Sequence, residues 1–282
     1  MESRFARFVI KLGAGFAMLF LYIPLVIVVL YAFNDSVGQK WPITSFTTKY
    51  FALAWRNSDL HTSIVNSLEI ATVATLLALL LGSAAAFAVH RYRFFGRNAI
   101  SLLLVLPIAL PGIVTAIALL SSFTNFGVTI GLFTTMVGHA TFCIVVVYNN
   151  VIERLRRTPG SLVEASMDLG ADGWQTFRHV TFPSIRTAVI AGALLAFALS
   201  FDEIIVTNFL VGAETTVPKF IFNNLRQPRN RPIVNVVAVA AMLIMLIPVI
   251  IAQRLVGGAQ AVGTSGRRER SVAVEPLEGA EP

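Results

Sequence analysis

SLVEASMDLGADGWQTFRHVTFP, residues 161–183, is the long polar interruption between apolar segments that carries the signals of folded structure. Ser161 followed three positions later by Glu164 is the pattern of a capping box, in which each side chain accepts a hydrogen bond from the backbone N–H of the other residue at the start of a helix. Gly170 suits the left-handed conformation that commonly follows the last turn of a helix. The first half of the stretch therefore predicts a short helix that begins at Ser161 and ends at Gly170.

A second short helix is predicted after this glycine. Asp172 can cap its start, with Gln175 at the third helical position. An apolar face follows at helical spacing, made by Trp174, Phe177, Val180 and Thr181. Pro183 is expected to end this helix, just before the next apolar run.

The composition places the chain in a membrane. Of its 282 residues, 56% are hydrophobic and 13% are charged, against about 25% charged residues in soluble domains. The net charge of +7 does not indicate a nucleic-acid partner, because the basic residues lie in short loops between apolar runs and form no basic domain. The expected surroundings are therefore membrane lipid. The single cysteine, Cys143, lies inside an apolar run and is interpreted as a small core residue.

Apolar runs of about the 20 residues needed to cross a bilayer recur along the chain. They cover residues 12–33, 64–89, 99–123, 132–152, 188–211 and 233–255. The first run is too long for a signal peptide and no cleavage site follows it, so it is expected to remain as a span. Pro107 and Pro111 interrupt the third run, and such breaks survive in a bilayer where neighbouring helices satisfy the freed carbonyls, which predicts that this helix is buried in the bundle. The predicted fold class is all-α, a polytopic bundle of six transmembrane helices.

An even number of spans puts both termini on one side of the membrane. Most of the 22 Lys and Arg residues lie on that side, in the N-terminus, in the loops after the second and fourth spans, and in the tail. By the positive-inside rule this side is cytoplasmic, so we expect a bacterial inner-membrane protein with both termini in the cytoplasm. The exception is the segment between the last two spans, where four basic residues would face outward and could contact an external partner: Lys219, Arg226, Arg229 and Arg231.

The spacing within residues 161–183 resembles the EAA loop of the membrane subunits of ABC importers, the type I or MetI-like permeases. The matching positions are Glu164, Ala165, Ser166, Gly170, Val180, Phe182 and Pro183. Ser166, Val180 and Phe182 depart from the Ala, Ile and Leu of the family pattern, but each keeps the size or the apolar character. The resemblance implies that this loop is the coupling helix, which docks into a groove on a separate ATPase subunit. The alternative is an ordinary amphipathic helix pair on the cytoplasmic membrane surface.

The order of the other motifs sharpens this resemblance. FND follows the first span, RYRFFGR follows the second, LPIALPGIV lies in the third and LSFDEIIVTNFL lies in the fifth. Over nearly all of residues 20–255 this order looks like that of the second permease subunit of spermidine/putrescine importers. Permeases for opines, phosphonates and ferric iron share much of the pattern, so these cargoes remain alternatives. The chain is thereby divided into an N-terminal helix with its external loop (1–63), a permease core (64–255) and a cytoplasmic tail (256–282), which its content of Gly, Ser and charge predicts to be disordered.

The resemblance also implies partners. They are two copies of an ABC ATPase subunit, a second permease subunit, for which a paralogue is favoured over a copy, and an extracytoplasmic solute-binding protein. The chain itself contains no G-x-x-x-x-G-K-[ST] loop that could hold ATP phosphates. ATP and Mg²⁺ are therefore expected on the partner ATPase, with no cofactor, catalytic site or metal site in this chain.

Two carboxylates lie deep in the fifth apolar run. Asp202 sits near its midpoint, with Glu203 next to it, where an ionised group costs at least about 2.5–3.5 kcal/mol unless it meets water, a partner or a ligand. In a continuous helix Ser200, Glu203 and Thr207 share one face, at spacings of i, i+3 and i+7, while Asp202 points toward the adjoining face. This pattern predicts a polar stripe that lines a translocation path.

Glu69, in the outer half of the second run, adds a third carboxylate, and clustered acid at that depth favours a cationic cargo. Carboxylates would hold the ammonium groups of a polyamine, and the ring of Phe201 could cover its methylene groups. The alternative is that these acids form pairs within the bundle or with basic residues of a partner subunit.

Two other classes of protein compete with this interpretation. A self-powered secondary transporter would use the intramembrane acids as a proton or sodium site, but it leaves the EAA spacing as a coincidence. A membrane-embedded enzyme would rely on His139 in the fourth run, because the other histidines are scattered without ligand spacing. His139 is instead interpreted as a hydrogen-bonded residue of the bundle.

Overall fold

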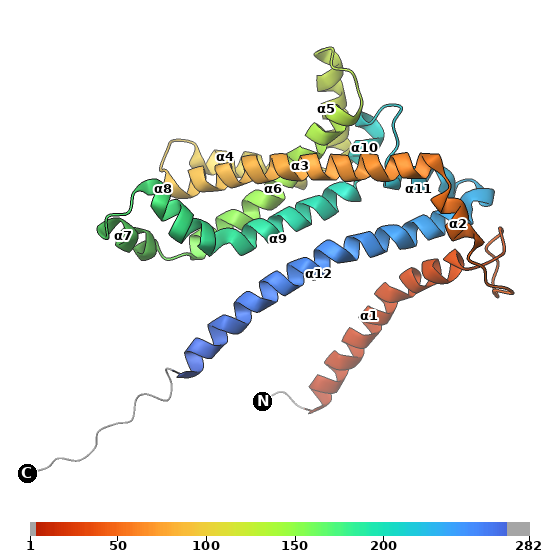
Figure 1. Ribbon diagram of the computed structural model, residues 1–282, viewed down its shortest axis with the longest axis horizontal. Coiled ribbons are helices and arrows are strands. Elements are labelled where there is room, and N and C mark those ends of the chain that lie inside the picture. The colour runs from red at the N-terminus through yellow and green to blue at the C-terminus, as the bar shows by residue number, and fades with distance from the viewer. Residues whose placement is uncertain (1–3, 270–282) are drawn as a thin grey trace, which may run out of the picture.

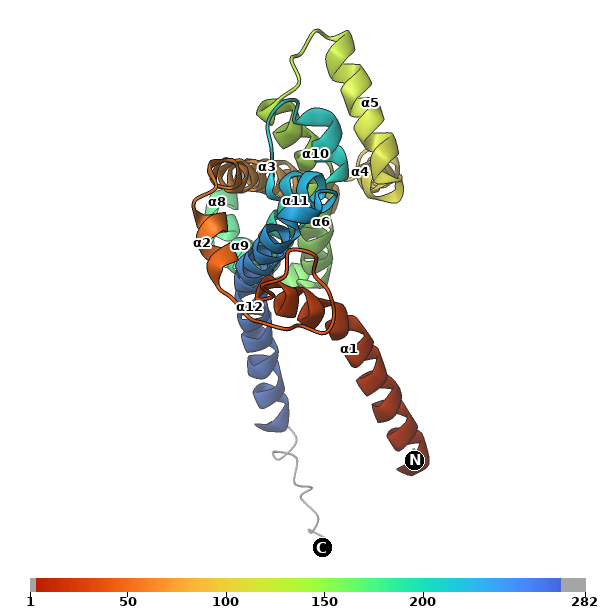
Figure 2. The same cartoon turned by 90° about the vertical axis from the view of Figure 1, so that its right-hand side faces the viewer.

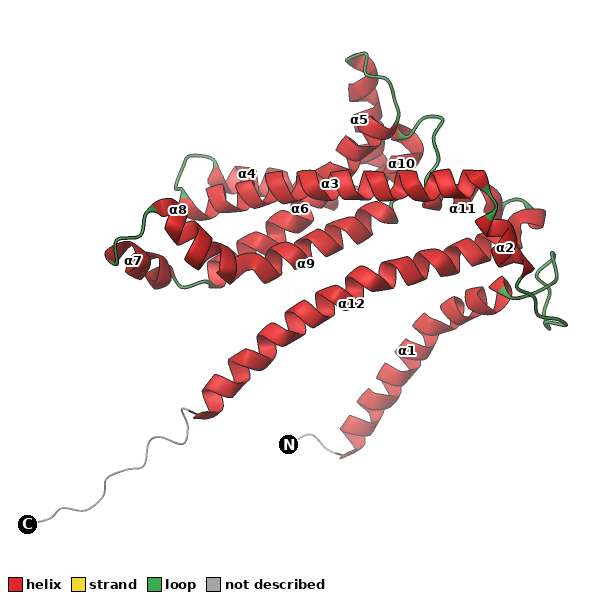
Figure 3. Cartoon of the chain, viewed as in Figure 1, coloured by secondary structure: helices red, strands yellow, loops and turns green. Residues whose placement is uncertain are grey.

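Helices account for the regular structure of residues 4–269, the part of the chain that the computed structural model describes. Figure 3 shows these helices joined by loops, with no strand among those residues, so the predicted all-α class is confirmed. In chain order the elements are α1 (Arg4–Ala32), α2 (Lys49–Trp55), α3 (Ser58–Arg91), α4 (Arg97–Ala109), α5 (Gly112–Asn125), α6 (Leu132–Arg157), α7 (Gly160–Asp168), α8 (Gly173–Thr176), η1 (Phe177–Thr181), α9 (Phe182–Phe201), α10 (Ile205–Leu210), α11 (Val217–Leu225), η2 (Pro228–Asn230) and α12 (Arg231–Glu269).

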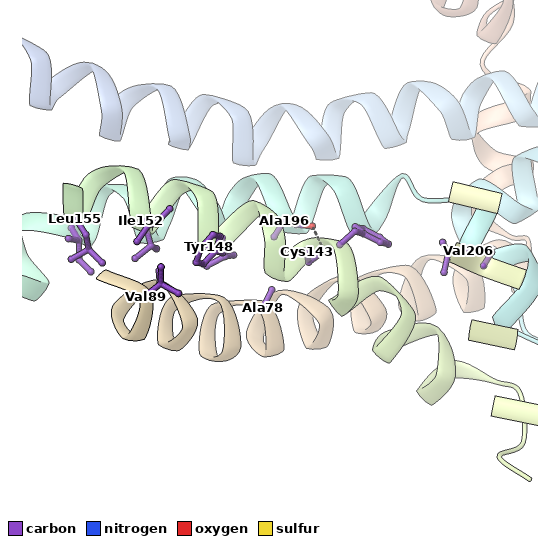
Figure 4. Close-up of a cluster of buried hydrophobic side chains, with 14 of the residues drawn as sticks. Ala78, Val89, Cys143, Tyr148, Ile152, Leu155, Ala196 and Val206 are labelled. Carbon is purple, nitrogen blue, oxygen red and sulfur yellow. Dashed lines mark hydrogen bonds between the residues drawn. The ribbon is translucent and has the colours of Figure 1, made fainter. Parts of the chain in front are cut away.

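The helices α3, α6 and α9 pack side by side and form the centre of the bundle (Figure 1). The buried face of α3 is rich in small residues, of which Ala71, Ala74, Ala78 and Ala86 are fully buried. Small side chains let helix backbones approach closely, and van der Waals packing of this kind drives helix association in a membrane. Figure 4 shows α3 and α6 directing side chains toward each other, with Cys143 Sγ of α6 donating to the carbonyl oxygen of Ala196 in α9 at 3.4 Å. The interpretation of Cys143 as a small core residue is thus confirmed.

At Gly82 the backbone of α3 lies close to α6, and Gly82→Ala is expected to destabilise the bundle. A Cβ at this position would lie 2.7 Å from the carbonyl oxygen of Ile144 and 3.1 Å from Cβ of Val147. Overpacking of this kind costs about 1–3 kcal/mol, so the melting temperature of the purified protein in detergent should fall. Gly13→Ala in α1 is the control, because a Cβ there meets no atom within 4 Å. Equal melting temperatures for the two variants would contradict the close approach of α3 to α6.

Five helices of the described residues are long and apolar enough to cross a membrane: Ala6–Ala32, Ser58–Arg91, Leu132–Arg157, Gly173–Phe201 and Pro228–Ile251. Four of them cover the predicted first, second, fourth and sixth spans. The predicted third span is present as a broken pair of shorter helices, and the predicted fifth span has different bounds. The arrangement is consistent with the six predicted spans, although five long helices are found where six were expected.

The third span breaks at Leu110, between α4 and α5. A proline disfavours the helical conformation in the residue before it, and Leu110 is extended, with φ −82° and ψ 145°, next to Pro111. Figure 2 shows α5 at the outside of the bundle, beside α10. Of the α5 residues only Ala116 is buried. The prediction that this helix is buried is therefore wrong for α5 within this chain, because α5 packs mainly against the short helix α10 and most of its surface stays uncovered.

The fifth span runs from Gly173 to Phe201, not from 188 to 211. The prediction that Pro183 ends a short helix is wrong, because α8, η1 and α9 form one continuous helix. The segment η1 is a π-helical turn, closed by the bond from Phe182 N to Phe177 O, and Pro183 follows it in the first turn of α9. Proline and π-helical turns bend a helix at one place without having to end it, so the helix continues past Pro183 to Phe201.

The helices α1 and α12 lie outside this centre. Figure 1 shows them leaving the α2–α11 end of the bundle, with α12 packed along α9 near that end and α1 beside α12. The α12 helix continues to Glu269, whereas the sequence predicted a tail without structure from residue 256. Glycines in a helix cost only about 1 kcal/mol each, and no proline interrupts residues 249–269, so helical propagation is not stopped there. Residues 270–282 of the predicted tail lie outside the described residues.

Candidate functional site: an end loop and a broken helix

The first candidate region is the loop that α7 and α8 form at one end of the bundle. Figure 1 shows it beyond the C-terminal ends of α3 and α6 and opposite to the end that holds α2, α10 and α11. None of the residues of α7 is buried. The sequence therefore folds a small structured projection here, not a slack connection.

The turn at the end of α7 has the predicted form. Gly170 is left-handed, with φ +87°. The N–H of Ala171 donates to the carbonyl oxygen of Ser166 at 3.1 Å, and that of Gly170 donates to the carbonyl oxygen of Met167 at 2.9 Å. These two bonds are the Schellman motif, which satisfies the last carbonyls of a helix and fixes the direction in which the chain leaves it. The predicted turn at Gly170 is confirmed.

One of the two predicted capping boxes is present. Asp172 Oδ1 accepts from Gln175 N at 2.7 Å, and Gln175 Oε1 accepts from Asp172 N at 3.0 Å. The box predicted at Ser161 and Glu164 is wrong, because α7 begins at Gly160 and no side chain caps its first turn. Ser161 lies inside that turn, and an N-cap residue must instead have non-helical backbone angles.

The positions of the EAA pattern fall into a buried side and an exposed side. Ser166 Oγ lies 3.1 Å from Thr176 Oγ1, and Thr176 is only 2% exposed, so this pair ties α7 to α8. The sequence did not reveal this pair, because both residues gave no signal beyond helix formation. Val180 is half-buried, while Glu164 and Ala165 are exposed. The exposed side is therefore available to a partner.

Aromatic rings attach this loop to the bundle. Phe177 lies 5.5 Å from Phe87 of α3 in an edge arrangement, 5.6 Å from Trp174 and 6.0 Å from Phe182, measured between ring centroids. Aromatic pairs at such distances contribute about 0.5–1.5 kcal/mol each. These rings pack α8 and η1 against α3 and the start of α9.

The free surface of the loop is apolar. Leu162, Met167 and Leu169 are exposed, Leu169 by 89%, and Glu164 in the same loop is exposed as well. Contiguous exposed apolar residues with a polar rim are typical of protein contacts. The loop therefore has the chemistry of a docking surface for another protein.

The second candidate region is the break between α9 and α10, at residues 202–204. The predicted stripe of Ser200, Glu203 and Thr207 on one helix face is wrong, because α9 ends at Phe201. Glu203 Oε1 accepts from the N–H groups of Ile205 at 2.7 Å and of Val206 at 3.1 Å. This carboxylate satisfies the free donors at the start of α10, as an acidic residue at a helix N-terminus does.

Ser200 and Thr207 are nevertheless brought together, by His139 of α6. His139 Nδ1 lies 2.8 Å from Ser200 Oγ, and its Nε2 lies 3.0 Å from Thr207 Oγ1. The imidazole is 1% exposed. The interpretation of His139 as a hydrogen-bonded residue of the bundle is confirmed, although the sequence did not reveal which residues it bonds.

Asp202 and Phe201 do not belong to the His139 network and lie on another side of the break. They line a cavity of about 410 Å³ between α9, α11 and α12, together with Ile221, Met242 and Met245. Asp202 is the one charged residue among the described residues that line it. The arrangement places one carboxylate against apolar and aromatic walls, which suits an ammonium group attached to a hydrocarbon chain.

The third predicted carboxylate does not join this cavity. Glu69 is exposed on the outer face of α3. Its neighbours Asn66 and Ser67 turn inward and hold the α10–α11 loop, where Asn66 Nδ2 donates to Thr215 O at 2.9 Å and Ser67 Oγ accepts from Val217 N at 2.8 Å. Within residues 4–269 no group of three or more His, Cys, Asp or Glu side chains could hold a metal ion.

In the basic segment between the last two long helices, some of the charged side chains have partners within the segment itself. Lys219 Nζ donates to the carbonyl oxygens of Gly212 at 2.9 Å and of Glu214 at 3.0 Å. Desolvation lowers the pKa of Lys219, and the charge of Glu214 opposes this effect. Arg226 lies 5.1 Å from the ring centroid of Phe222. Two of the four basic residues of this segment therefore have partners within it.

The sequence matches a protein family with this architecture. Residues 78–258 match the family described as "Binding-protein-dependent transport system inner membrane component". The chain is 33% identical over 248 residues to the spermidine/putrescine transport system permease protein PotC of Escherichia coli (strain K12), covering 88% of this chain and 93% of that protein. It is 34% identical over 228 residues to the putrescine transport system permease protein PotI of the same organism, covering 78% and 80% of the two chains.

Solved structures share the fold. A chain of a bacterial ABC transporter involved in the import of the acidic polysaccharide alginate superposes with a TM-score of 0.68 at 16% identity, covering 92% of this chain and 98% of that one. A chain of the MetNI methionine ABC transporter in inward-facing conformations superposes with a TM-score of 0.60 at 16% identity, covering 76% and 99%. At this identity the likeness concerns the arrangement of the helices.

Proposed function

Because the chain belongs to the family of binding-protein-dependent transport system inner membrane components, the permease subunits of ABC importers, we propose that it forms the translocation path for a polyamine such as spermidine or putrescine. As such a subunit it works with separate ATPase subunits and a periplasmic binding protein. The observation that carries the proposed cargo is the cavity in which Asp202 is the charged lining residue beside Phe201. The names of the relatives support the same cargo.

Coupling to ATP hydrolysis would occur through the α7–α8 loop. Its exposed Glu164 and apolar side chains offer a docking surface, while Gly170, Ser166 and the ring of Phe177 connect that surface rigidly to the bundle. ATP and Mg²⁺ would be bound by the partner ATPase, of which two copies would be present. The second permease subunit would be a paralogue of this chain.

The topology that we propose keeps the loop and both termini in the cytoplasm. Figure 1 supports this orientation, because the first residues of α1 and the last residues of α12 lie away from the α2–α11 end of the bundle. The Arg residues at the ends of α3 and α6 near the loop support it as well, by the positive-inside rule.

Other cargoes are distinguished by one experiment. The complete complex, with its ATPase, second permease and binding protein, is reconstituted in vesicles and supplied with spermidine, putrescine, an opine, a phosphonate or ferric iron. We expect saturable uptake of the two polyamines that requires ATP. Uptake of an opine, a phosphonate or iron without uptake of either polyamine would contradict the proposed cargo. Uptake without the ATPase would instead favour a secondary transporter.

A further inference from the structure

His139 joins the two sides of the break in the fifth span. Ser200 lies in the last turn of α9 and Thr207 in α10, and the ring of His139 lies between them, at 2.8 and 3.0 Å. The ring belongs to α6, which is part of the centre of the bundle. One side chain thus holds both sides of the corner against a helix that is itself firmly packed.

The directions of the hydrogen bonds around His139 assign the tautomer of its imidazole ring. Thr207 Oγ1 donates to the carbonyl oxygen of Glu203 at 2.6 Å, so toward His139 it can only accept. His139 Nε2 therefore carries the proton. In the neutral imidazole Nδ1 is then an acceptor, which receives the hydroxyl proton of Ser200. The network runs without a gap from Ser200 through His139 and Thr207 to the backbone of Glu203.

Neighbouring contacts leave α10 little freedom. Thr134 Oγ1 donates to the carbonyl oxygen of Leu210 at 2.9 Å. Gly138 lets α10 lie against α6, since a Cβ there would be 2.5 Å from Leu210 Cδ1 and 3.1 Å from Val206 Cγ1. Thr134, Gly138 and His139 thus place α10 against the first two turns of α6, and the direction of the residues before α10 is set with it.

We propose that His139 is a positioning residue for cargo binding, which fixes the corner between α9 and α10 so that Asp202 faces the cavity. This inference rests on the proposed function, because it gives Asp202 the role of contacting the cationic cargo. His139 itself is buried and is not among the residues that line the cavity, so its proposed role is indirect.

The test measures polyamine uptake by the complete reconstituted complex. His139→Phe keeps a ring of similar size but removes both hydrogen bonds, and it is expected to raise KM about tenfold, the effect of losing roughly one buried polar contact. His139→Gln keeps a donor and an acceptor and should restore most of the affinity. Thr141→Val is the control on the same helix: the hydroxyl of Thr141 donates to Gly138 O within α6, and its loss should leave KM unchanged.

A merely structural role would give a different result. If His139→Phe only reduced the amount of folded complex, the maximal rate would fall while KM stayed the same, and the inference would be overturned. Ser200→Ala is a second, milder variant that removes one bond of the network, and we expect it to raise KM by a smaller factor than His139→Phe. An unchanged KM in both variants would overturn the inference.

A double-mutant cycle with Asp202→Asn separates this inference from the proposed function. If His139 acts through Asp202, then His139→Phe should raise KM in the wild type but add little to Asp202→Asn. An equal factor in both backgrounds would overturn the positioning role and leave the proposed function intact. If Asp202→Asn alone leaves KM unchanged, the cargo contact fails, and the positioning role fails with it.

Discussion

Replacing Gly170 by valine is expected to reduce ATP-driven uptake at least about tenfold while the permease remains inserted and folded. A non-glycine residue in the left-handed region costs about 1–2 kcal/mol, and a β-branched one is a stronger outlier, so the turn at φ +87° would be lost. A Cβ at Gly170 meets no atom within 4 Å, so the effect would come from the backbone and not from a clash with the bundle. The direction of α7 relative to α8 would change, and with it the docking surface.

Two control variants test whether the effect comes from the backbone conformation at Gly170. Gly170→Asn should keep much of the uptake, because Asn adopts the left-handed conformation more readily than other residues. Gly173→Ala adds a methyl group nearby, at a position without positive φ and without a neighbour within 4 Å, and should transport at the wild-type rate. The measurement is uptake together with co-purification of the ATPase subunit. Wild-type uptake by Gly170→Val with the ATPase attached would contradict the coupling role of the loop.

The parts of this loop that the sequence predicted are those that depend on local backbone chemistry. Gly170 and the Asp172–Gln175 capping box need only residues a few positions apart, and both are present. Pro183 shows the limit of local rules, because the helix continues through this proline after a π-helical turn that the sequence did not predict. The bond between Ser166 and Thr176 joins two helices and has no signature in either one.

The sequence did not predict the break in the fifth span, because the residues after it are apolar. Residues 204–206 are Ile, Ile and Val, so the run reads as continuous although the carboxylate of Glu203 starts a new helix there. His139 is far in the sequence from Ser200 and Thr207, and no spacing rule joins them. The available signal was chemical: a lone histidine in an apolar run needs two partners, and Gly138 beside it marks a close helix contact.

Asp202→Asn is expected to raise the KM for polyamine uptake by about ten- to one-hundredfold. A hydrogen bond to a charged group contributes about 1.5–3 kcal/mol, and each 1.4 kcal/mol is a factor of about ten. The neighbouring Glu203→Gln removes the same charge at almost the same depth, but its amide oxygen can still accept from Ile205 N and Val206 N. This variant should therefore change KM much less. Complex assembly, measured by co-purification of the ATPase, should be unaffected in both.

The comparison of these two variants distinguishes direct contact between the cargo and one carboxylate from attraction by the negative potential of both. If a general negative potential attracted the cation, loss of either charge would weaken uptake to a similar extent. If the cargo contacts one carboxylate, only the acid that lines the cavity beside Phe201 should matter, because the other is engaged by the backbone of α10. Equal increases in KM would refute the direct contact in favour of the field. An unchanged KM in Asp202→Asn would remove the cavity from the translocation path.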